Sequence, residues 1–416
     1  MADELLTLTK ASPEEQIRAF FEATQFGFHM PRATDDAFQH WLPTVTTDDI
    51  TMRVLPDPDE PDGLPVATFA SFDKTIQTGL ELLPAHMITD VTVSPTHRRR
   101  GLLRAMMTAD LTGAHDAGLP VAALTVTEAT IYGRFGFGPG TFQQSVEVDT
   151  SVKFAHRPGL ADTEGRIRMV KPEASWDMIN KVFTRFHATT RGSIDRPDHY
   201  RLWLTNEFDF DADGKGRKLR LAVHLDAAGE CDGYVAYEVD RSTKPRTIKV
   251  GDMIALNRTA RIGLWEFLAS IDLVERITVG NSPLDDPLPW SILDRRGYKI
   301  TGVTDNLWFR LLDAERCLGA RPWLTDGEIV LGITDPMGFA DGSYAIRAAD
   351  GRAAVTRTTD PSEVTVDIET ASSLWLGGTT TRRMVEAGRI SGSPEAITRF
   401  ARLSDLHTPP HSITFF

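Results

Sequence analysis

An arginine-rich loop between a strand-like and a helix-like segment restricts the fold of this chain more than any other feature of its sequence. Residues 87–93 alternate apolar and polar side chains as a strand does, and residues 102–117 follow a helical pattern that ends at Gly118. Residues 120–127 again resemble a strand. A strand, a helix and a strand within about forty residues predict a βαβ unit, and therefore an α/β domain.

The loop itself suggests a phosphate site. Arg98, Arg99 and Arg100 precede Gly101, and Arg104 lies in the first turn of the expected helix. Unpaired N–H groups at a helix start bind phosphate, and arginines add charge-assisted hydrogen bonds. The loop matches neither G-x-x-x-x-G-K nor G-x-G-x-x-G, so it is neither a Walker loop nor a dinucleotide fingerprint. We predict that it binds a pyrophosphate; a merely solvated basic loop is the alternative.

The middle of the chain repeats this order of elements. Strand, loop with helix, and strand are expected at residues 249–256, 258–268 and 276–280. Residues 131–137 also align without a gap with residues 292–298, where Leu293 replaces Tyr132, and two of the three loop arginines are absent. We interpret this as a second copy of the fold that has lost its chemistry, with chance similarity as the alternative.

The last hundred residues follow a different pattern. Strands are expected at 308–312, 328–333, 343–347 and 364–368, and helices at 313–318, 370–376 and 380–387. This order predicts an α+β domain with helices on an antiparallel sheet. The chain ends in Phe415 and Phe416. Free tails are usually polar, so we expect this tail to dock on the protein.

Composition narrows the function classes. The 416 residues carry a net charge of −13 and two cysteines, Cys231 and Cys317. A nucleic-acid binder normally has a basic surplus. Two distant cysteines provide neither a disulfide framework nor a cysteine-based zinc site, which fits a reducing compartment. No signal peptide and no run of about eighteen apolar residues is visible. We expect a cytoplasmic protein that binds no nucleic acid and no metal and spans no membrane; non-classical secretion stays open.

The negative charge is concentrated at the N-terminal end. Residues 1–90 contain 16 aspartates and glutamates against 5 lysines and arginines. Such a surplus usually forms a solvated face that keeps a protein soluble. The alternative is an acidic cleft that concentrates a cationic substrate.

Two motifs carry a resemblance to a known family. Residues 91–106 (VTVSPTHRRRGLLRAM) resemble the acyl-CoA pyrophosphate loop of GNAT acetyltransferases, although Leu103 stands where Gly or Ala is usual. Together with residues 131–139 (IYGRFGFGP), they closely resemble the enhanced intracellular survival (Eis) family of actinobacterial N-acetyltransferases. The resemblance implies two tandem GNAT-type domains, of which the second has no cofactor, and a C-terminal sterol-carrier-protein-like α+β domain. We place these domains at residues 1–155, 156–306 and 307–416.

The resemblance also implies roles for individual residues. Tyr132 corresponds to the general acid of the family, and the terminal carboxylate of Phe416 to the general base. The residues expected to bind acetyl-CoA are Val91, Thr92, Val93, Arg98, Arg99, Arg100, Gly101, Leu102, Leu103, Arg104, Thr127 and Glu128. A homohexamer built as a trimer of dimers is implied as well.

The chemistry of acetyl transfer agrees with these roles. The departing thiolate needs a proton, which a phenol can donate, and the attacking amine must lose one. Burial beside aromatic residues raises the pKa of a terminal carboxylate and makes it a better base. Glu128 is a rival base, His97 is expected to be a hydrogen-bonding loop residue, and Asp90 could face the acceptor amine. Packing roles alone remain the alternatives for Tyr132 and Phe416.

The predicted function is acetyl-CoA-dependent N-acetylation of primary amines. The acidic N-terminal segment suits polycationic acceptors such as aminoglycosides, polyamines or lysine side chains. The alternatives are a tandem GNAT-fold transferase for a longer acyl or an aminoacyl group, and a non-enzymatic lipid carrier.

Overall fold

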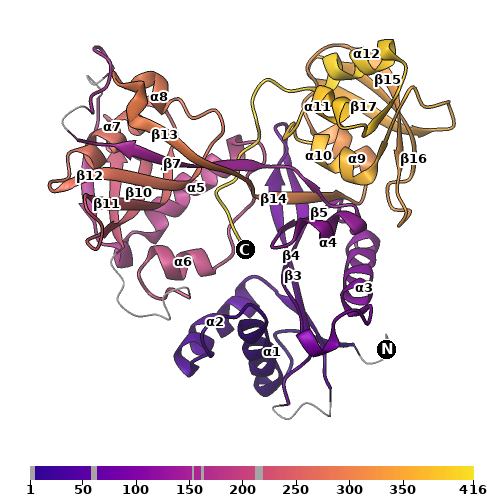
Figure 1. Ribbon diagram of the computed structural model, residues 1–416, viewed down its shortest axis with the longest axis horizontal. Helices are drawn as coiled ribbons and strands as arrows, with labels where there is room; N and C mark the ends of the chain where they lie inside the picture. The colour runs from indigo at the N-terminus through magenta and orange to yellow at the C-terminus, as the bar shows by residue number, and fades with distance from the viewer. Residues whose placement is uncertain (1–4, 58–62, 152–153, 161–163, 211–218) are drawn as a thin grey trace.

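The computed structural model describes residues 5–57, 63–151, 154–160, 164–210 and 219–416. Their strands form three sheets, and Figure 1 shows the central sheet and the third sheet on either side of the first. Two seven-stranded sheets and one five-stranded sheet agree with the predicted division into two larger domains and a smaller one. The turn-rich stretch around residues 58–62 lies outside the described residues.

The first sheet contains the predicted βαβ unit. Its seven strands are, in spatial order, β1 (Leu6–Leu8), β2 (Thr51–Leu55), β3 (Ala67–Gln77), β4 (Leu82–Val93), β5 (Val121–Thr125), β14 (Leu307–Leu311) and β6 (Gly138–Pro139). β4 and β5 are parallel and are connected by α3 (Leu102–Asp116), as predicted. The other helices of this domain are α1 (Glu14–Gly27), α2 (Asp35–Thr47) and α4 (Ala129–Tyr132).

The two faces of the first sheet have separate apolar cores. Since side chains alternate along a strand, Met87 and Ala123 point to the side of α1 and α2, whereas Ile88 and Leu124 point to the side of α3. In Figure 1, α1 and α2 lie on one side of β3 and β4, and α3 lies on the other. This division later separates the two halves of the candidate site.

The sequence also predicts how α1 begins, because Ser12 and Glu15 have the S-x-x-E spacing of a capping box. A capping box at Ser12 and Glu15 would begin the helix at residue 13, but α1 begins at Glu14 with Pro13 as its N-cap and without a side-chain cap. The Ser12 hydroxyl instead accepts a hydrogen bond from the Thr9 amide at 3.0 Å. A capping-box prediction at Ser12 is therefore wrong, because the local turn uses the hydroxyl.

The central sheet also has seven strands. In spatial order they are β13 (Tyr298–Asp305), β7 (Phe142–Asp149), β12 (Val274–Ser282), β11 (Arg246–Ala255), β10 (Cys231–Asp240), β9 (Arg220–Leu225) and β8 (Arg166–Val170). Its helices are α5 (Trp176–Thr189), α6 (His199–Leu204), α7 (Arg258–Ala269) and α8 (Leu288–Ser291). β11, α7 and β12 form the expected second βαβ unit, with β11 and β12 parallel.

The first two sheets exchange strands. β7 follows the N-terminal elements along the chain but lies in the central sheet, between β13 and β12. β14, which we expected in the third domain, pairs with β5 and β6 of the first sheet. The strand at 308–312 was therefore predicted correctly as a strand but in the wrong sheet. The exchange fastens the domains to one another through backbone hydrogen bonds.

The third sheet is smaller. Its strands are, in spatial order, β17 (Arg352–Thr358), β16 (Gly342–Ala349), β15 (Gly327–Thr334), β18 (Val364–Asp367) and β19 (Ile390–Gly392), and its helices are α9 (Ala314–Ala320), α10 (Ile368–Leu374), α11 (Thr381–Glu386) and α12 (Pro394–Ser404). β17, β19 and α12 were not anticipated. No helix among the described residues is long and apolar enough to cross a membrane.

A buried ion pair joins the third domain to the first. Arg310 of β14 donates to both oxygens of Asp335 at 2.7 and 2.8 Å, and both side chains are inaccessible to solvent. Its Nε also donates to the Phe135 carbonyl at 2.6 Å. Breaking a buried pair leaves an uncompensated charge, so this pair holds the segment after α4 firmly against the third domain.

Candidate active site

A bulge in β4 opens the first sheet. Thr68 pairs with Thr92 and Ala70 pairs with Thr89, so the single residue between them on β3 opposes two residues of β4, Asp90 and Val91. Asp90 has φ +54°, a left-handed conformation that is strained for a residue other than glycine. Such strain is often found at functional sites.

Beyond this bulge, β4 and β5 no longer pair. Their parallel register ends at Ile88 and Leu124, although β4 continues to Val93. Val91, Thr92 and Val93 therefore run beside β5 without pairing to it, which leaves backbone groups available for a ligand with amides of its own. We call the region between these unpaired strand ends the gap.

The arginine loop lies on the α3 side of this gap. A 3₁₀ turn at Pro95–His97 leads into two residues with positive φ, Arg99 at +65° and Gly101 at +79°. Gly101 is the N-cap of α3, and a Cβ built on it would meet no atom within 4 Å, so this helix start is open to a bulky group. All four arginines of this segment are exposed, namely Arg98, Arg99, Arg100 and Arg104. In the first turn of the helix, Leu102 is buried and Leu103 is half-buried.

His97 supports the loop rather than facing a substrate. Its ring is buried, and Nε2 lies 2.8 Å from Oδ2 of Asp57. Nδ1 lies 2.8 Å from the Thr96 hydroxyl. With both ring nitrogens engaged, the geometry agrees with the expected role of a hydrogen-bonding loop residue.

Tyr132 ends the short helix α4 on the α3 side of the sheet. Its ring is buried in the same core as Phe137, with an edge-to-face contact at 6.4 Å between ring centres. Burial, and next the charge of Glu128, raise the pKa of the Tyr132 phenol to about 12. The phenol therefore keeps its proton throughout the neutral range. Thr127 and Glu128 are exposed in the turn between β5 and α4.

The C-terminal tail ends on the opposite face of the sheet. In Figure 1 the chain end lies between α6 and β14. A terminal oxygen of Phe416 accepts a hydrogen bond from Thr125 Oγ1 at 2.9 Å, at the end of β5. The Phe416 ring contacts Phe72 edge to face, with 5.7 Å between ring centres. The expected docking of the tail is thus confirmed, and it places the carboxylate beside the gap.

A cavity of about 610 Å³ opens in front of the terminal carboxylate. Its walls come from the first domain, from the central domain and from the tail. Aromatic side chains dominate them, among which are Phe20, Trp41, Phe72, Trp203, Phe210 and Phe416. Three aspartates, Asp48, Asp90 and Asp209, also line it, whereas no lysine or arginine does among the described residues. Tyr132 does not line this cavity.

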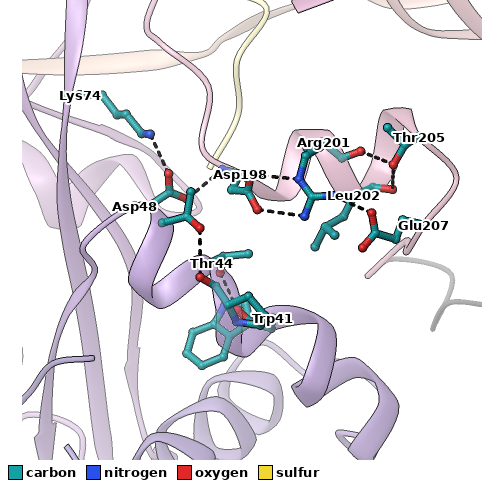
Figure 2. A network of polar contacts seen from close by, with 11 residues as sticks. Trp41, Thr44, Asp48, Lys74, Asp198, Arg201, Leu202, Thr205 and Glu207 are labelled. Atoms are coloured by element: carbon teal, nitrogen blue, oxygen red, sulfur yellow. Dashed lines mark hydrogen bonds and ion pairs between the residues drawn. The ribbon is translucent and has the colours of Figure 1, made fainter. Parts of the chain in front are cut away.

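Asp48 connects the two domains at the cavity wall. One of its carboxylate oxygens accepts from Lys74 Nζ at 2.7 Å, and the other accepts from the Asp198 amide at 2.8 Å (Figure 2). Asp198 in turn binds Arg201, which also binds Glu207 at 2.6 Å. The charge of Asp48 is therefore compensated within the protein, and Asp48 has a structural role here.

Two further groups of the cavity, Asp90 and His199, have pKa values that are shifted mainly by burial. Burial raises the pKa of Asp90 to about 6, and its carboxylate receives no hydrogen bond from the described part of the chain. Burial, as the largest cause, lowers the pKa of His199 to about 4, so this ring is neutral at physiological pH. At pH 7 Asp90 is therefore mostly ionised, and His199 adds no positive charge to the cavity.

The buried carboxylate of Asp90 should lower the stability of the folded protein in a pH-dependent manner. The pKa of Asp90 is higher in the folded protein than in the unfolded chain. Its contribution to the free energy of unfolding is therefore most favourable below the unfolded pKa near 3.8, and it is lost as the pH rises through about 6. A pKa shift of about two units corresponds to a change of at most about 3 kcal/mol in the free energy of unfolding. Asp90→Asn should therefore raise the melting temperature at pH 8 and leave it nearly unchanged at pH 4. An equal shift at both pH values in thermal unfolding would contradict this account.

The candidate residues thus fall into two groups across the gap. The arginine loop, the end of β4 and Tyr132 lie toward α3, and the carboxylate of Phe416 lies toward the cavity. Sequence reasoning found the first group and the tail. It missed Trp203, Phe210 and His199, because no local motif marks residues that meet only in the folded chain.

Comparison with known protein families agrees with this geometry. Residues 9–140 and residues 192–311 each match a family described as "Acetyltransferase (GNAT) domain", and residues 314–412 match "Sterol carrier protein domain". A split between parallel strands beside an open, basic helix start, in a chain with two such domains, defines a GNAT N-acetyltransferase.

Individual relatives specify the family. An uncharacterized N-acetyltransferase from Streptomyces griseus is 36% identical over 336 residues, which cover 79% of this chain and 81% of that protein. N-acetyltransferase Eis from Mycobacterium tuberculosis is 33% identical over 328 residues, which cover 77% and 78%. The crystal structure of Eis1 from Mycobacterium abscessus superposes with a TM-score of 0.82 at 28% identity, over 99% of this chain and 100% of that one. The chain belongs to the Eis family of N-acetyltransferases.

Proposed function

We propose that this protein transfers an acetyl group from acetyl-CoA to a primary amine in the gap between β4 and β5. The observation that carries the proposal is the meeting, at this gap, of a basic open helix start on one face with a cavity and a terminal carboxylate on the other. Cofactor and acceptor would thus enter from opposite faces and react where the strands separate. Holding both reactants in place supplies much of the rate.

On the α3 side, the open N-terminus of α3 and the four exposed arginines would hold the pyrophosphate of acetyl-CoA. The free edge formed by Val91, Thr92 and Val93 suits the pantetheine amides. Leu102 and Leu103 form the first turn of the helix, and Thr127 and Glu128 border the far side of the gap. No metal takes part in this proposal.

On the cavity side, the carboxylate of Phe416 would remove the proton from the acceptor ammonium. Phe416 is half-buried at the cavity wall, and its ring packs against Phe72. Tyr132 would donate a hydrogen bond, and then a proton, to the departing thiolate. Its phenol of pKa about 12 is a weak acid, so donation depends on the thiolate being desolvated as well.

The acceptor is proposed to be polycationic, as in aminoglycosides, polyamines or lysine side chains. The aspartates of the cavity and the absence of lysine and arginine from its described lining support a cationic ligand. The acidic surplus of the first ninety residues contributes little here. Among the described residues of that segment, the carboxylates that line the cavity are those of Asp48 and Asp90, and Asp48 is paired with Lys74. A hexameric assembly and a cytoplasmic location stay predictions.

The proposal is tested by thiol release from acetyl-CoA in the presence of aminoglycosides, polyamines, lysine-containing peptides and simple monoamines. We expect release to depend on a primary amine and to yield the N-acetylated product by mass spectrometry. Preference for octanoyl-CoA or myristoyl-CoA over acetyl-CoA would instead favour a longer-chain acyltransferase. Absence of release with every donor, together with co-purified lipid, would favour a carrier.

A further inference from the structure

The central domain holds the C-terminal tail in place. We define the tail as residues 411–416 and the clamp as residues 191–200, which join α5 to the first turn of α6. The His411 amide donates to the Arg191 carbonyl at 2.8 Å, and Thr414 Oγ1 donates to the Ile194 carbonyl at 2.9 Å. The clamp thus binds the tail at His411 and at Thr414.

Tyr200 contacts the backbone of the tail shortly before the terminal carboxylate. Its hydroxyl donates to the Ile413 carbonyl at 3.2 Å and accepts from the Phe415 amide at 2.9 Å. One side-chain oxygen thereby bridges two backbone groups of the tail, and the second of them belongs to the residue before Phe416. Burial, as the main cause, raises the Tyr200 pKa to about 12, so the hydroxyl keeps the proton that it donates.

The tyrosine ring is itself fixed by buried groups. Arg196 lies over the ring, with 4.6 Å from its guanidinium carbon to the ring centre. Arg196 is buried and donates to Asp252 at 2.7 Å and to the Tyr234 hydroxyl at 2.8 Å. Trp203 contacts the ring from the side, with 6.1 Å between ring centres. The hydroxyl therefore has little freedom to move.

The clamp is also fastened to the sheet that carries the proposed cofactor strand. The backbone N–H of Gly192 donates to the Gln77 carbonyl at 2.7 Å. The backbone N–H of Gln77 donates to the Ser193 carbonyl at 2.9 Å. Asp195 donates to the Thr75 carbonyl at 3.0 Å. These bonds attach the clamp to β3, and β3 pairs with β4. The tail thus has a fixed position relative to the gap, through the clamp and β3.

We propose that Tyr200 is a positioning residue for the reaction, which places the terminal carboxylate through its two hydrogen bonds to the tail. The central domain, which lacks the arginine loop, then serves catalysis by holding a group that the end of the chain supplies. This inference rests on the proposed role of the Phe416 carboxylate. A displacement of about 1 Å in a reacting group can lower a rate by about 100-fold, so the hydroxyl should matter although it touches no reacting atom.

The test compares Tyr200→Phe with the wild type and with a variant that lacks Phe416. Tyr200→Phe keeps the ring under Arg196 and removes only the bridging hydroxyl. We expect kcat for amine acetylation to fall by roughly 10- to 100-fold, with the KM for acetyl-CoA changed by less than about twofold. In the protein that lacks Phe416, the same substitution should have almost no further effect, because the group that it positions is gone.

A second readout does not depend on acetylation. Carboxypeptidase A removes aromatic C-terminal residues, so it should release Phe416 about tenfold faster from Tyr200→Phe than from the wild type, because the tail opens locally more often. Thr414→Val, which removes the hydrogen bond to Ile194, should act in the same direction. Tyr344→Phe is the matched control, since its buried hydroxyl bonds to the Ala340 carbonyl far from the tail.

Two results would overturn the inference, and they differ from failure of the proposed function. If Tyr200→Phe behaves as Tyr344→Phe does in both assays while loss of Phe416 abolishes turnover, the base assignment stands and the positioning role is wrong. If the double variant loses the product of the two single reductions in kcat, Tyr200 acts on something other than the tail. If the protein without Phe416 keeps full turnover, the base assignment fails and this inference fails with it.

Discussion

Replacing Tyr132 with phenylalanine should lower kcat by roughly 10²- to 10⁴-fold and leave the affinity for acetyl-CoA almost unchanged. This range is typical of the removal of one general acid. The phenylalanine ring keeps the edge-to-face contact with Phe137, so the core on the α3 side should remain intact. Single-turnover acetylation, together with equilibrium binding of CoA, measures the two effects separately.

Tyr298→Phe provides the control for this substitution. Its phenol is half-buried in the central domain, where it bonds to Asp286 at 3.0 Å and to Gln144 at 2.9 Å, and its pKa is raised mainly by burial as well. Loss of this hydroxyl should leave turnover near that of the wild type. If Tyr132→Phe turns over as fast as Tyr298→Phe, Tyr132 is a packed aromatic residue and not the acid.

Deleting Phe416 should abolish most amine acetylation, with a loss of about 10²-fold or more. The new terminal carboxylate would lie one residue back, about 3.3–3.6 Å along the chain, and would lose the hydrogen bond from Thr125. A C-terminal tag should have the same consequence, because it turns the carboxylate into an amide. Steady-state thiol release measures both variants.

Two further variants separate the carboxylate from the aromatic ring. Phe416→Leu keeps a terminal carboxylate at the same position, and we expect it to retain a substantial part of the activity. One glycine added after Phe416 keeps the ring against Phe72 but moves the charge away, and it should be as inactive as the deletion. High activity of the glycine-extended protein would show that the ring anchors the tail and that another group is the base.

The sequence allowed part of the site to be predicted because that part is local. The loop from Arg98 to Gly101 is contiguous, and its position between a strand and a helix follows from periodicity alone. The backbone conformation that such a loop needs is present, with positive φ at Arg99 and Gly101. An open helix start flanked by arginines is thus readable from about ten residues.

The cavity could not be predicted in this way. Its walls combine residues near 20, 41, 72, 203 and 416, which come together only through the packing of two domains and a tail. The exchange of β7 and β14 between sheets has no signal in hydrophobic alternation, since a strand has the same pattern in either sheet. The bulge at Asp90 depends on the pairing register of β3 and β4, which periodicity also leaves open.

Charge counted along the sequence proved a poor guide to charge in the site. Most acidic residues of the first ninety do not line the cavity, and Asp48, which does, is paired with Lys74. Asp209, which also lines the cavity, comes from the central part of the chain and not from this segment. Only the folded arrangement shows which carboxylates line the cavity.

Titration calorimetry of the full-length protein with CoA tests the central claim most directly. The account predicts exothermic binding with one CoA per chain, because only the first of the two GNAT-type domains has the arginine loop. Replacing Arg99 and Arg100 with alanine should weaken this binding by roughly 10- to 100-fold, since two charge-assisted contacts to phosphate are lost. Two CoA molecules per chain, no heat of binding, or unchanged affinity in the double variant would contradict the account.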